Sequence, residues 1–120
     1  MNSAHRYLSE LADQVSDWDV ALIRQAVLVF ARLNDGRVSA NDFRDYLPPT
    51  SQGAVGLVIR QLPCKKHGQL IRKARAVPGG WSITEPSTAE STHGKPIQVW
   101  ELTPAGWDAA RQLMGDKAVA

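Results

Sequence analysis

An α+β fold, mainly α and organised as one domain, is predicted by three observations. Apolar residues recur with helical spacing along most of the chain, whereas residues 69–77 and 97–102 alternate as strands do. Residues 78–95 are rich in Pro, Gly, Ser and Thr, which predicts a long loop between the two strands. The length of 120 residues suits one domain with a modest core. The expected division is an N-terminal helical extension (1–16), a main domain (17–114) and a frayed tail (115–120).

The first two helices are predicted from apolar periodicity. Residues 4–15 form the first, with Leu8, Leu11 and Val15 on one face. The second covers residues 18–33, with Asp17 as the expected N-cap. Its apolar stripe is so broad that we expect it to be the most buried helix of the domain. That stripe comprises Leu22, Ala26, Val29, Phe30 and Leu33, widened by Ile23 and Val27.

A short helix is expected next. Asn34-Asp35-Gly36 ends the preceding helix, because glycine adopts the left-handed conformation that closes a helix. Gly36-Arg37-Val38 is long enough only for a strand-like bridge. Ser39-Ala40-Asn41-Asp42 has the spacing of a capping box, with Asp42 as the acidic partner. The short helix then continues through Phe43, Tyr46 and Leu47 and ends at Pro48-Pro49.

The third helix is predicted over residues 52–62. Thr50 or Ser51 is its expected N-cap, and Pro63 ends it. Apolar residues at the i, i+3, i+4 and i+7 positions form an inward face. That face comprises Val55, Val58, Ile59 and Leu62. The outward face comprises Gln52, Gly53, Gly56, Leu57 and Arg60.

A last helix is predicted directly after the second strand. Thr103 is its N-cap, and Pro104 takes its first position, where a missing N–H costs nothing. Its apolar stripe comprises Trp107, Ala110, Leu113 and Met114.

Basic residues are concentrated in one segment of the chain. The net charge is only +2, but residues 48–80 hold six basic residues and no acidic one. Such a concentration is typical of a surface that meets phosphate groups. A solvated basic loop is the alternative explanation. The six residues are Arg60, Lys65, Lys66, Arg72, Lys73 and Arg75.

The order of helix, bridge, short helix, helix, strand, long loop, strand and helix resembles a winged helix-turn-helix domain. The stretch VWELTPAGWDAARQL (99–113) is similar to the second wing strand of MarR- and PadR-type regulators and of many phage-encoded relatives, where a helix follows Leu-Thr-Pro at once. The resemblance covers residues 18–114 and implies a two-stranded wing with extra N- and C-terminal helices. It also implies a DNA-binding transcriptional regulator whose third helix enters the major groove.

Two features depart from that family pattern. The segment LPCKKHGQLI (62–71) is longer than the tight connection usual in the family and contains Pro63. The wing loop is also long, and it carries Glu85 and Glu90 against Lys95 and His93, which makes its tip a poor anchor in the minor groove. Trp81 and Ile83 in this loop suggest a small apolar contact with the domain body or with a partner.

The candidate DNA contacts follow from residue chemistry and from the resemblance. Gln52 can pair with adenine, and Arg60 can contact guanine or a phosphate. Gly53 and Gly56 on the outward face suit close approach of another molecule, although they would equally make room for a neighbouring helix of the same protein. Exposed N–H groups at a helix start attract phosphate. The candidate DNA-binding residues are Thr50, Ser51, Gln52, Gly53, Gly56, Arg60, Lys65, Lys66, Arg72, Lys73, Arg75 and Lys95.

Catalysis is not expected from this sequence. The three histidines are scattered, and Cys64 with His67 forms only half of a zinc site, which needs about four ligands. There is no Gly-rich phosphate loop either. Neither a metal nor a cofactor is therefore predicted.

Cys64 is expected to be an inert small hydrophobe, with a reactive thiol beside Lys65 and Lys66 as the alternative. A winged helix used as a protein–protein adaptor is the main rival to DNA binding.

The expected partners are duplex DNA and a second copy of the chain. Terminal helices often pair subunits in similar regulators, and the candidate contacts are Leu8 and Leu11 or Leu113 and Met114. Covering the core is the alternative role of these helices. A single cysteine fits a reducing compartment, and neither a membrane-spanning stretch nor a signal peptide is recognised, so we expect a cytoplasmic protein without membrane contact.

Overall fold

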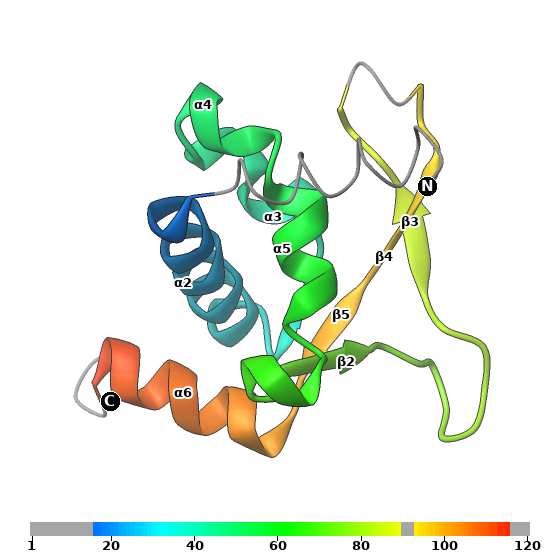
Figure 1. The fold of residues 1–120 in the computed structure, drawn as a ribbon. Helices are drawn as coiled ribbons and strands as arrows, with labels where there is room; N and C mark the ends of the chain where they lie inside the picture. The colour runs from blue at the N-terminus through cyan, green and yellow to red at the C-terminus, as the bar shows by residue number, and fades with distance from the viewer. Residues whose placement is uncertain (1–15, 90–92, 116–120) are drawn as a thin grey trace, which may run out of the picture.

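The computed structural model describes residues 16–89 and 93–115 and has an α+β fold with small antiparallel sheets (Figure 1). The expected helix over 4–15 and the tail beyond residue 115 lie outside the described residues. The elements are α2 (Asp17–Leu33), β1 (Arg37–Val38), α3 (Ala40–Phe43), the 3-10 turn η1 (Arg44–Tyr46), α4 (Pro49–Gln52), α5 (Val55–Gln61), the 3-10 turn η2 (Lys65–His67), β2 (Ile71–Lys73), β3 (Thr84–Pro86), β4 (Pro96–Gln98), β5 (Trp100–Leu102) and α6 (Pro104–Met114).

Helix α2 forms the centre of the core, but its buried face is turned from the predicted stripe. Ile23 and Val27 of that stripe are fully buried, whereas Leu22, Ala26, Val29 and Phe30 are only partly buried. The helix packs against α3, α5, α6, β1 and β5. Its fully buried residues are Ile23, Val27, Leu28 and Ala31. Two expectations about this helix were wrong. Ser16 rather than Asp17 is the N-cap, since its hydroxyl accepts the Asp19 N–H at 3.1 Å. Leu33 is 70% exposed and therefore does not belong to the buried face.

A three-stranded antiparallel sheet in the order β1-β5-β2 closes one side of the core. The turn before β1 has the predicted glycine, since Gly36 has a φ of 92° and its N–H donates to the Ala31 carbonyl at 2.7 Å. Strand β2 is shorter than the predicted 69–77. Both Gly68 and Gln69 have positive φ angles, so the chain becomes extended only near Ile71.

The segment expected to be a loop, 78–95, contains a strand, so that prediction was wrong in part. Strand β3 pairs antiparallel with β4, and only Val99 separates β4 from β5. The Val99 N–H donates to the Ile83 carbonyl, while the Val99 carbonyl accepts the Ala74 N–H, each at 3.0 Å. One arm, 96–102, therefore faces two shorter strands, β2 and β3. We call residues 71–102 the long hairpin and residues 76–81, which leave it between β2 and β3, the side loop (Figure 1).

Helix α6 follows β5 directly, with the predicted cap. The Thr103 hydroxyl accepts the Gly106 N–H at 3.1 Å and donates to the Gln69 carbonyl at 2.5 Å, so the helix start is joined to the entry of β2. Gly106 is buried, and a Cβ placed on it would lie 2.0 Å from the Leu70 carbonyl oxygen. Ala110 is buried as predicted, whereas Leu113 is 40% exposed and contributes little to the core.

Candidate nucleic-acid interface

The predicted third helix is divided in two. Helix α4 ends at Gln52 and α5 begins at Val55, and the turn residues Gly53 and Ala54 separate the two helices. Neither Thr50 nor Ser51 caps α5, because both lie inside α4 and Ala54 takes the N-cap position. The break falls at a glycine, a poor helix former. The inward face of α5 is as predicted: Val55, Val58, Ile59 and Leu62 are all buried.

The Ser51 side chain is buried and hydrogen-bonded within the protein, so it is not available to a phosphate group. It is 1% exposed, and its hydroxyl donates to Asp19 Oδ1 at 2.7 Å. That bond, with a second one from the Ser16 hydroxyl, lowers the pKa of the Asp19 carboxyl below its ordinary value. The prediction that Ser51 contacts DNA is therefore wrong, whereas Thr50 next to it is exposed. The bond joins α4 to the first turn of α2.

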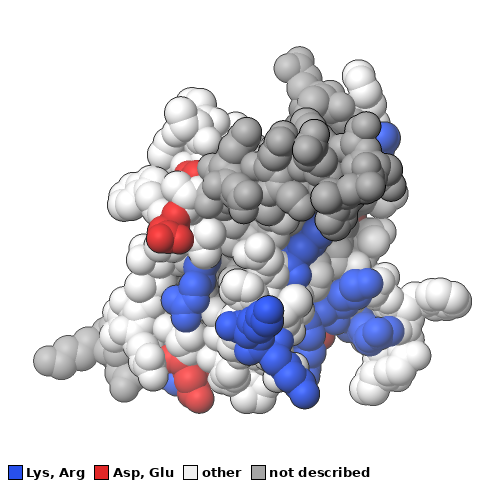
Figure 2. All heavy atoms as spheres, viewed as in Figure 1, with Lys and Arg blue, Asp and Glu red and all other residues white. Residues whose placement is uncertain are grey.

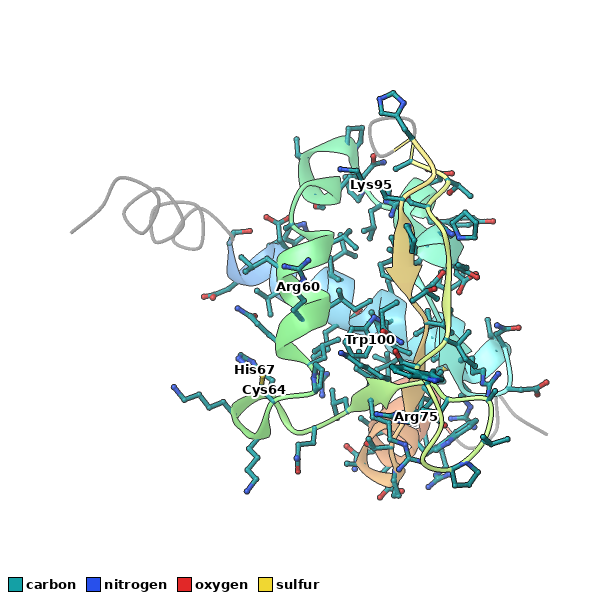
Figure 3. All side chains as sticks on the ribbon, turned by 90° about the vertical axis from the view of Figure 1, so that its right-hand side faces the viewer. Arg60, Cys64, His67, Arg75, Lys95 and Trp100 are labelled. Carbon is teal, nitrogen blue, oxygen red and sulfur yellow. The ribbon has the colours of Figure 1, made fainter. Side chains whose placement is uncertain are left out.

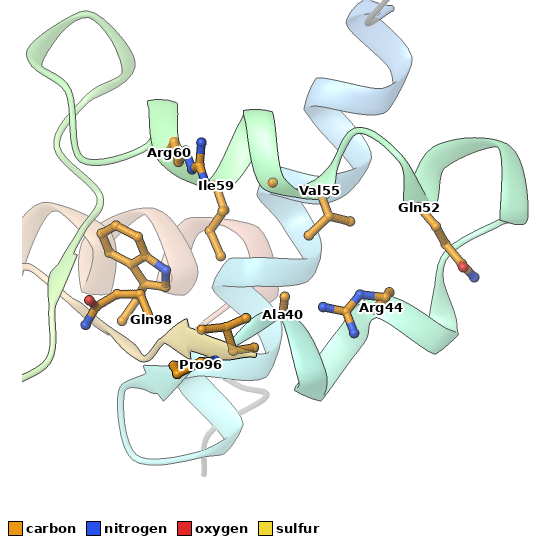
Figure 4. A pocket seen from close by; sticks show the side chains of 11 residues that line it. Ala40, Arg44, Gln52, Val55, Ile59, Arg60, Pro96 and Gln98 are labelled. Carbon is orange, nitrogen blue, oxygen red and sulfur yellow. The ribbon is translucent and has the colours of Figure 1, made fainter. Parts of the chain in front are cut away.

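A hollow of about 290 Å³ lies between α5 and residues 96–102, the uninterrupted arm of the long hairpin (Figure 4). Gln52, Gly56 and Arg60 of the predicted outward face line it from the helical side, together with Val55 and Ile59 of the inward face. Pro96, Ile97, Gln98 and Trp100 line it from the hairpin. Arg44, which the sequence did not single out, adds a second guanidinium group to Arg60, and no acidic residue lines the hollow. A lining with two positive charges and no negative charge favours an anionic group.

Gly53 and Gly56 leave the backbone of α5, and of the turn before it, uncovered by side chains. Both residues are exposed, and a Cβ on either would meet no atom of the described chain within 4 Å. The alternative explanation, that they make room for a neighbouring helix, therefore finds no support in the described part of the molecule. Bare backbone at this place permits close approach by another molecule.

Pairing in the sheet places Arg72 and Lys73 on opposite faces. Lys73 is the register partner of Trp100, so it lies on the same face as a residue that lines the hollow. Arg72 is the register partner of Glu101 and forms an ion pair with it at 3.7 Å. Arg72 is exposed but lies on the other face of the sheet from Lys73, so its contact with DNA stays a prediction. An alternating strand sends successive side chains to opposite sides, so charge in the stretch 72–75 does not by itself place these residues on one surface.

The remaining basic candidates are exposed. Lys65 and Lys66 lie in η2 directly after α5, and Lys95 precedes β4. Figure 2 shows Lys and Arg side chains gathered where α5 meets η2 and β2. In Figure 3, Arg60 and Arg75 lie on opposite sides of Trp100, with Lys95 towards the far end of the hairpin. Arg75 also has a local role, because its guanidinium donates to the Gly80 carbonyl.

The long hairpin is joined to α3 by a polar cluster that the sequence did not predict. The Asn41 amide nitrogen donates to Glu85 Oε1 at 3.0 Å and to the Pro86 carbonyl at 2.9 Å. Its carbonyl oxygen accepts from the Thr88 N–H at 2.8 Å. The Ser39 hydroxyl also donates to Glu85. Glu85, expected to weaken a free wing tip, is instead bonded to the domain body. The Ser39 N–H donates to Asp42 at 2.7 Å, as the capping box predicts.

Replacing Asn41 by alanine should loosen the hairpin from α3. The change removes bonds to Glu85, Pro86 and Thr88, each worth about 0.5–1.5 kcal/mol, and leaves Glu85 with fewer donors. We expect the free energy of unfolding to fall by about 1–3 kcal/mol in a urea titration. Hydrogen exchange should also become faster across β3 and β4. Asp45→Ala, at an exposed position of η1, is the control. An unchanged hydrogen-exchange rate in β3 would show that Asn41 does not hold the hairpin to α3.

No family model, curated protein or solved structure matches this chain. Over residues 16–89 and 93–115, none of the helices has the length and apolar character needed to cross a bilayer. In the same part of the chain, no three His, Cys, Asp or Glu side chains come together as metal ligands.

Proposed function

We propose that this chain is a winged helix-turn-helix protein that binds duplex DNA and regulates transcription in the cytoplasm. The element order and the β1-β5-β2 sheet support this architecture, with α5 as the reading helix and the long hairpin as the wing. One observation carries the proposal. The outward face of α5 presents bare backbone at Gly56 beside Arg60 and Arg44, next to a surface rich in Lys and Arg.

In this proposal α5 enters the major groove, and the surrounding cations contact phosphates. Arg60 is placed to reach a base edge, since it is exposed and lines the hollow in front of α5. Lys65, Lys66 and Lys73 suit phosphate contacts, which strengthen binding to every sequence alike. Arg72 lies apart from this surface, because it is paired with Glu101 on the other face of the sheet.

A protein–protein adaptor is the second candidate function. The exposed apolar side chains favour it, since Trp18 is 68% exposed and Trp81 is 94% exposed. A homodimer is compatible with either function and would let two reading helices contact paired half-sites. Of the candidate contacts, Leu113 on α6 is 40% exposed and Met114 is partly buried, whereas Leu8 and Leu11 lie outside the described residues.

A duplex titration at two salt concentrations tests the proposed function. At about 50 mM salt, we expect a fluorescent duplex pool to bind in the micromolar range or tighter, and binding should weaken steeply as salt rises. Lys73→Ala should weaken binding to all sequences and lower the salt slope by about one unit. Arg72→Ala removes an equal charge from the opposite face and should change the slope much less. Absence of duplex binding at low salt would refute the proposal and favour the adaptor.

A further inference from the structure

Trp81 is the most exposed of the four tryptophans whose exposure the structure describes. Its side chain is 94% exposed, whereas Trp100 is 9% exposed and Trp107 is partly buried against the core. Val77, on the same side loop, is 60% exposed. Leaving an indole in water forgoes the stabilisation of burying roughly 150–250 Å² of surface. The exposed ring adds nothing to the core and is free to contact another molecule.

The side loop is held in a defined conformation. The Gly80 N–H donates to the Val77 carbonyl at 3.0 Å, and Gly79 has a φ of 75°, which gives a turn with Pro78 and Gly79 at its two central positions. The Arg75 guanidinium donates to the Gly80 carbonyl, and Arg75 forms a β-bridge with Ser82. These bonds hold Gly80 and Ser82, the two neighbours of Trp81. The indole therefore projects from a loop of fixed shape at the edge of the sheet.

The charges around this loop favour an anionic occupant. Exposed Arg75 and Lys73 precede it in the chain, and the Arg37 guanidinium donates to the Arg75 carbonyl at 3.2 Å. The nearby acidic side chains are already engaged, Glu101 with Arg72 and Glu85 with Asn41. An aromatic ring beside guanidinium and ammonium groups suits nucleobases flanked by phosphates better than an apolar protein surface.

We propose that Trp81 is a base-contacting wedge, which inserts its indole against a base step of the duplex that α5 binds. This inference rests on the proposed function. It assigns the contact to the side loop rather than to the tip of the long hairpin. Apolar side chains inserted at a base step partly unstack it and bend the duplex, and the bend brings more protein surface into contact. The fixed loop lets the ring insert without first ordering a mobile segment.

Tryptophan fluorescence and affinity on a duplex test the wedge. Stacking on bases quenches indole emission, so wild-type protein should lose emission on duplex addition, and Trp81→Phe should remove most of that change. Trp18→Phe, at the start of α2 and 68% exposed, is the matched control and should retain it. Trp81→Ala should weaken duplex binding about tenfold, whereas Trp81→Phe keeps an aromatic ring and should bind nearly as wild type. Both variants should melt at the wild-type temperature, because the ring makes almost no core contact.

The outcomes separate this inference from the proposed function. Duplex binding by wild-type protein, with full affinity in Trp81→Ala and full quenching in Trp81→Phe, would overturn the wedge and leave DNA binding standing. Absence of duplex binding by the wild-type chain would overturn both. Loss of self-association in Trp81→Ala with unchanged duplex affinity would assign the ring to a protein contact and so overturn the wedge.

Discussion

Gly56→Leu should abolish duplex binding while the protein stays folded. A Cβ at this position meets nothing within 4 Å, so the new side chain extends into the hollow in front of α5 instead of into the core. Leucine is the better helix former, and the free energy of unfolding should be unchanged or higher by up to about 1 kcal/mol. In the groove the same side chain would separate the helix backbone from the bases. A thermal melt and a duplex titration on one variant measure both effects.

Two further variants make this test specific. Gly56→Ala adds only one methyl group and should weaken binding less than leucine does. Ala21→Leu adds comparable bulk at an exposed position of α2 and should leave duplex affinity unchanged. A folded Gly56→Leu protein with wild-type duplex affinity would show that α5 is not the reading element. The adaptor would then be the better account of this fold.

Gly106→Ala should destabilise the protein by about 3 kcal/mol or more, because its Cβ would lie 2.0 Å from the Leu70 carbonyl oxygen and 3.0 Å from Leu102 Cδ2. The nearest atom belongs to the backbone, so relief requires α6 to move away from Leu70. That movement would also strain the bond between the Thr103 N–H and the Leu70 carbonyl, 3.1 Å long. A urea titration measures the loss of unfolding free energy.

Gly53→Ala is the matched control for this change. Its Cβ meets nothing within 4 Å and its φ is −66°, so alanine fits without strain. Its unfolding free energy should equal that of the wild type or exceed it slightly. Equal stability of the Gly106→Ala and Gly53→Ala proteins would contradict the close approach of α6 to the Leu70 carbonyl.

Local signals in the sequence were sufficient wherever the deciding interaction lies within one turn or one helix. The Thr103 cap, the Pro104 start and the Gly36 turn involve residues only a few positions apart, and all three predictions are confirmed. The inward face of α5 is confirmed for a similar reason, because helical periodicity brings side chains three and four positions apart onto one side. Such features need no knowledge of the rest of the fold.

The candidate site depended more on contacts between distant residues. Ser51 resembles a helix cap by type and position, but Asp19, 32 positions earlier, accepts its hydroxyl and removes it from the surface. Arg72 and Lys73 are adjacent on a predicted strand, so alternation alone places them on opposite faces. Only their pairing with β5 shows which of the two shares a face with Trp100 and the hollow. No local pattern reveals these distant partners.

By itself the sequence determined the approximate positions of most of the described helices, the caps at Ser39 and Thr103 and the charge of the segment 48–80. Backbone sterics, capping and helical periodicity act over a few residues, so they can be recognised in a short window. Only the tertiary structure decided which of these charges share a surface, that β3 lies within an expected loop, and that Asn41 joins α3 to Glu85. The physical reason is that strand pairing and side-chain bonds between residues 44 positions apart arise from packing, which no single segment specifies.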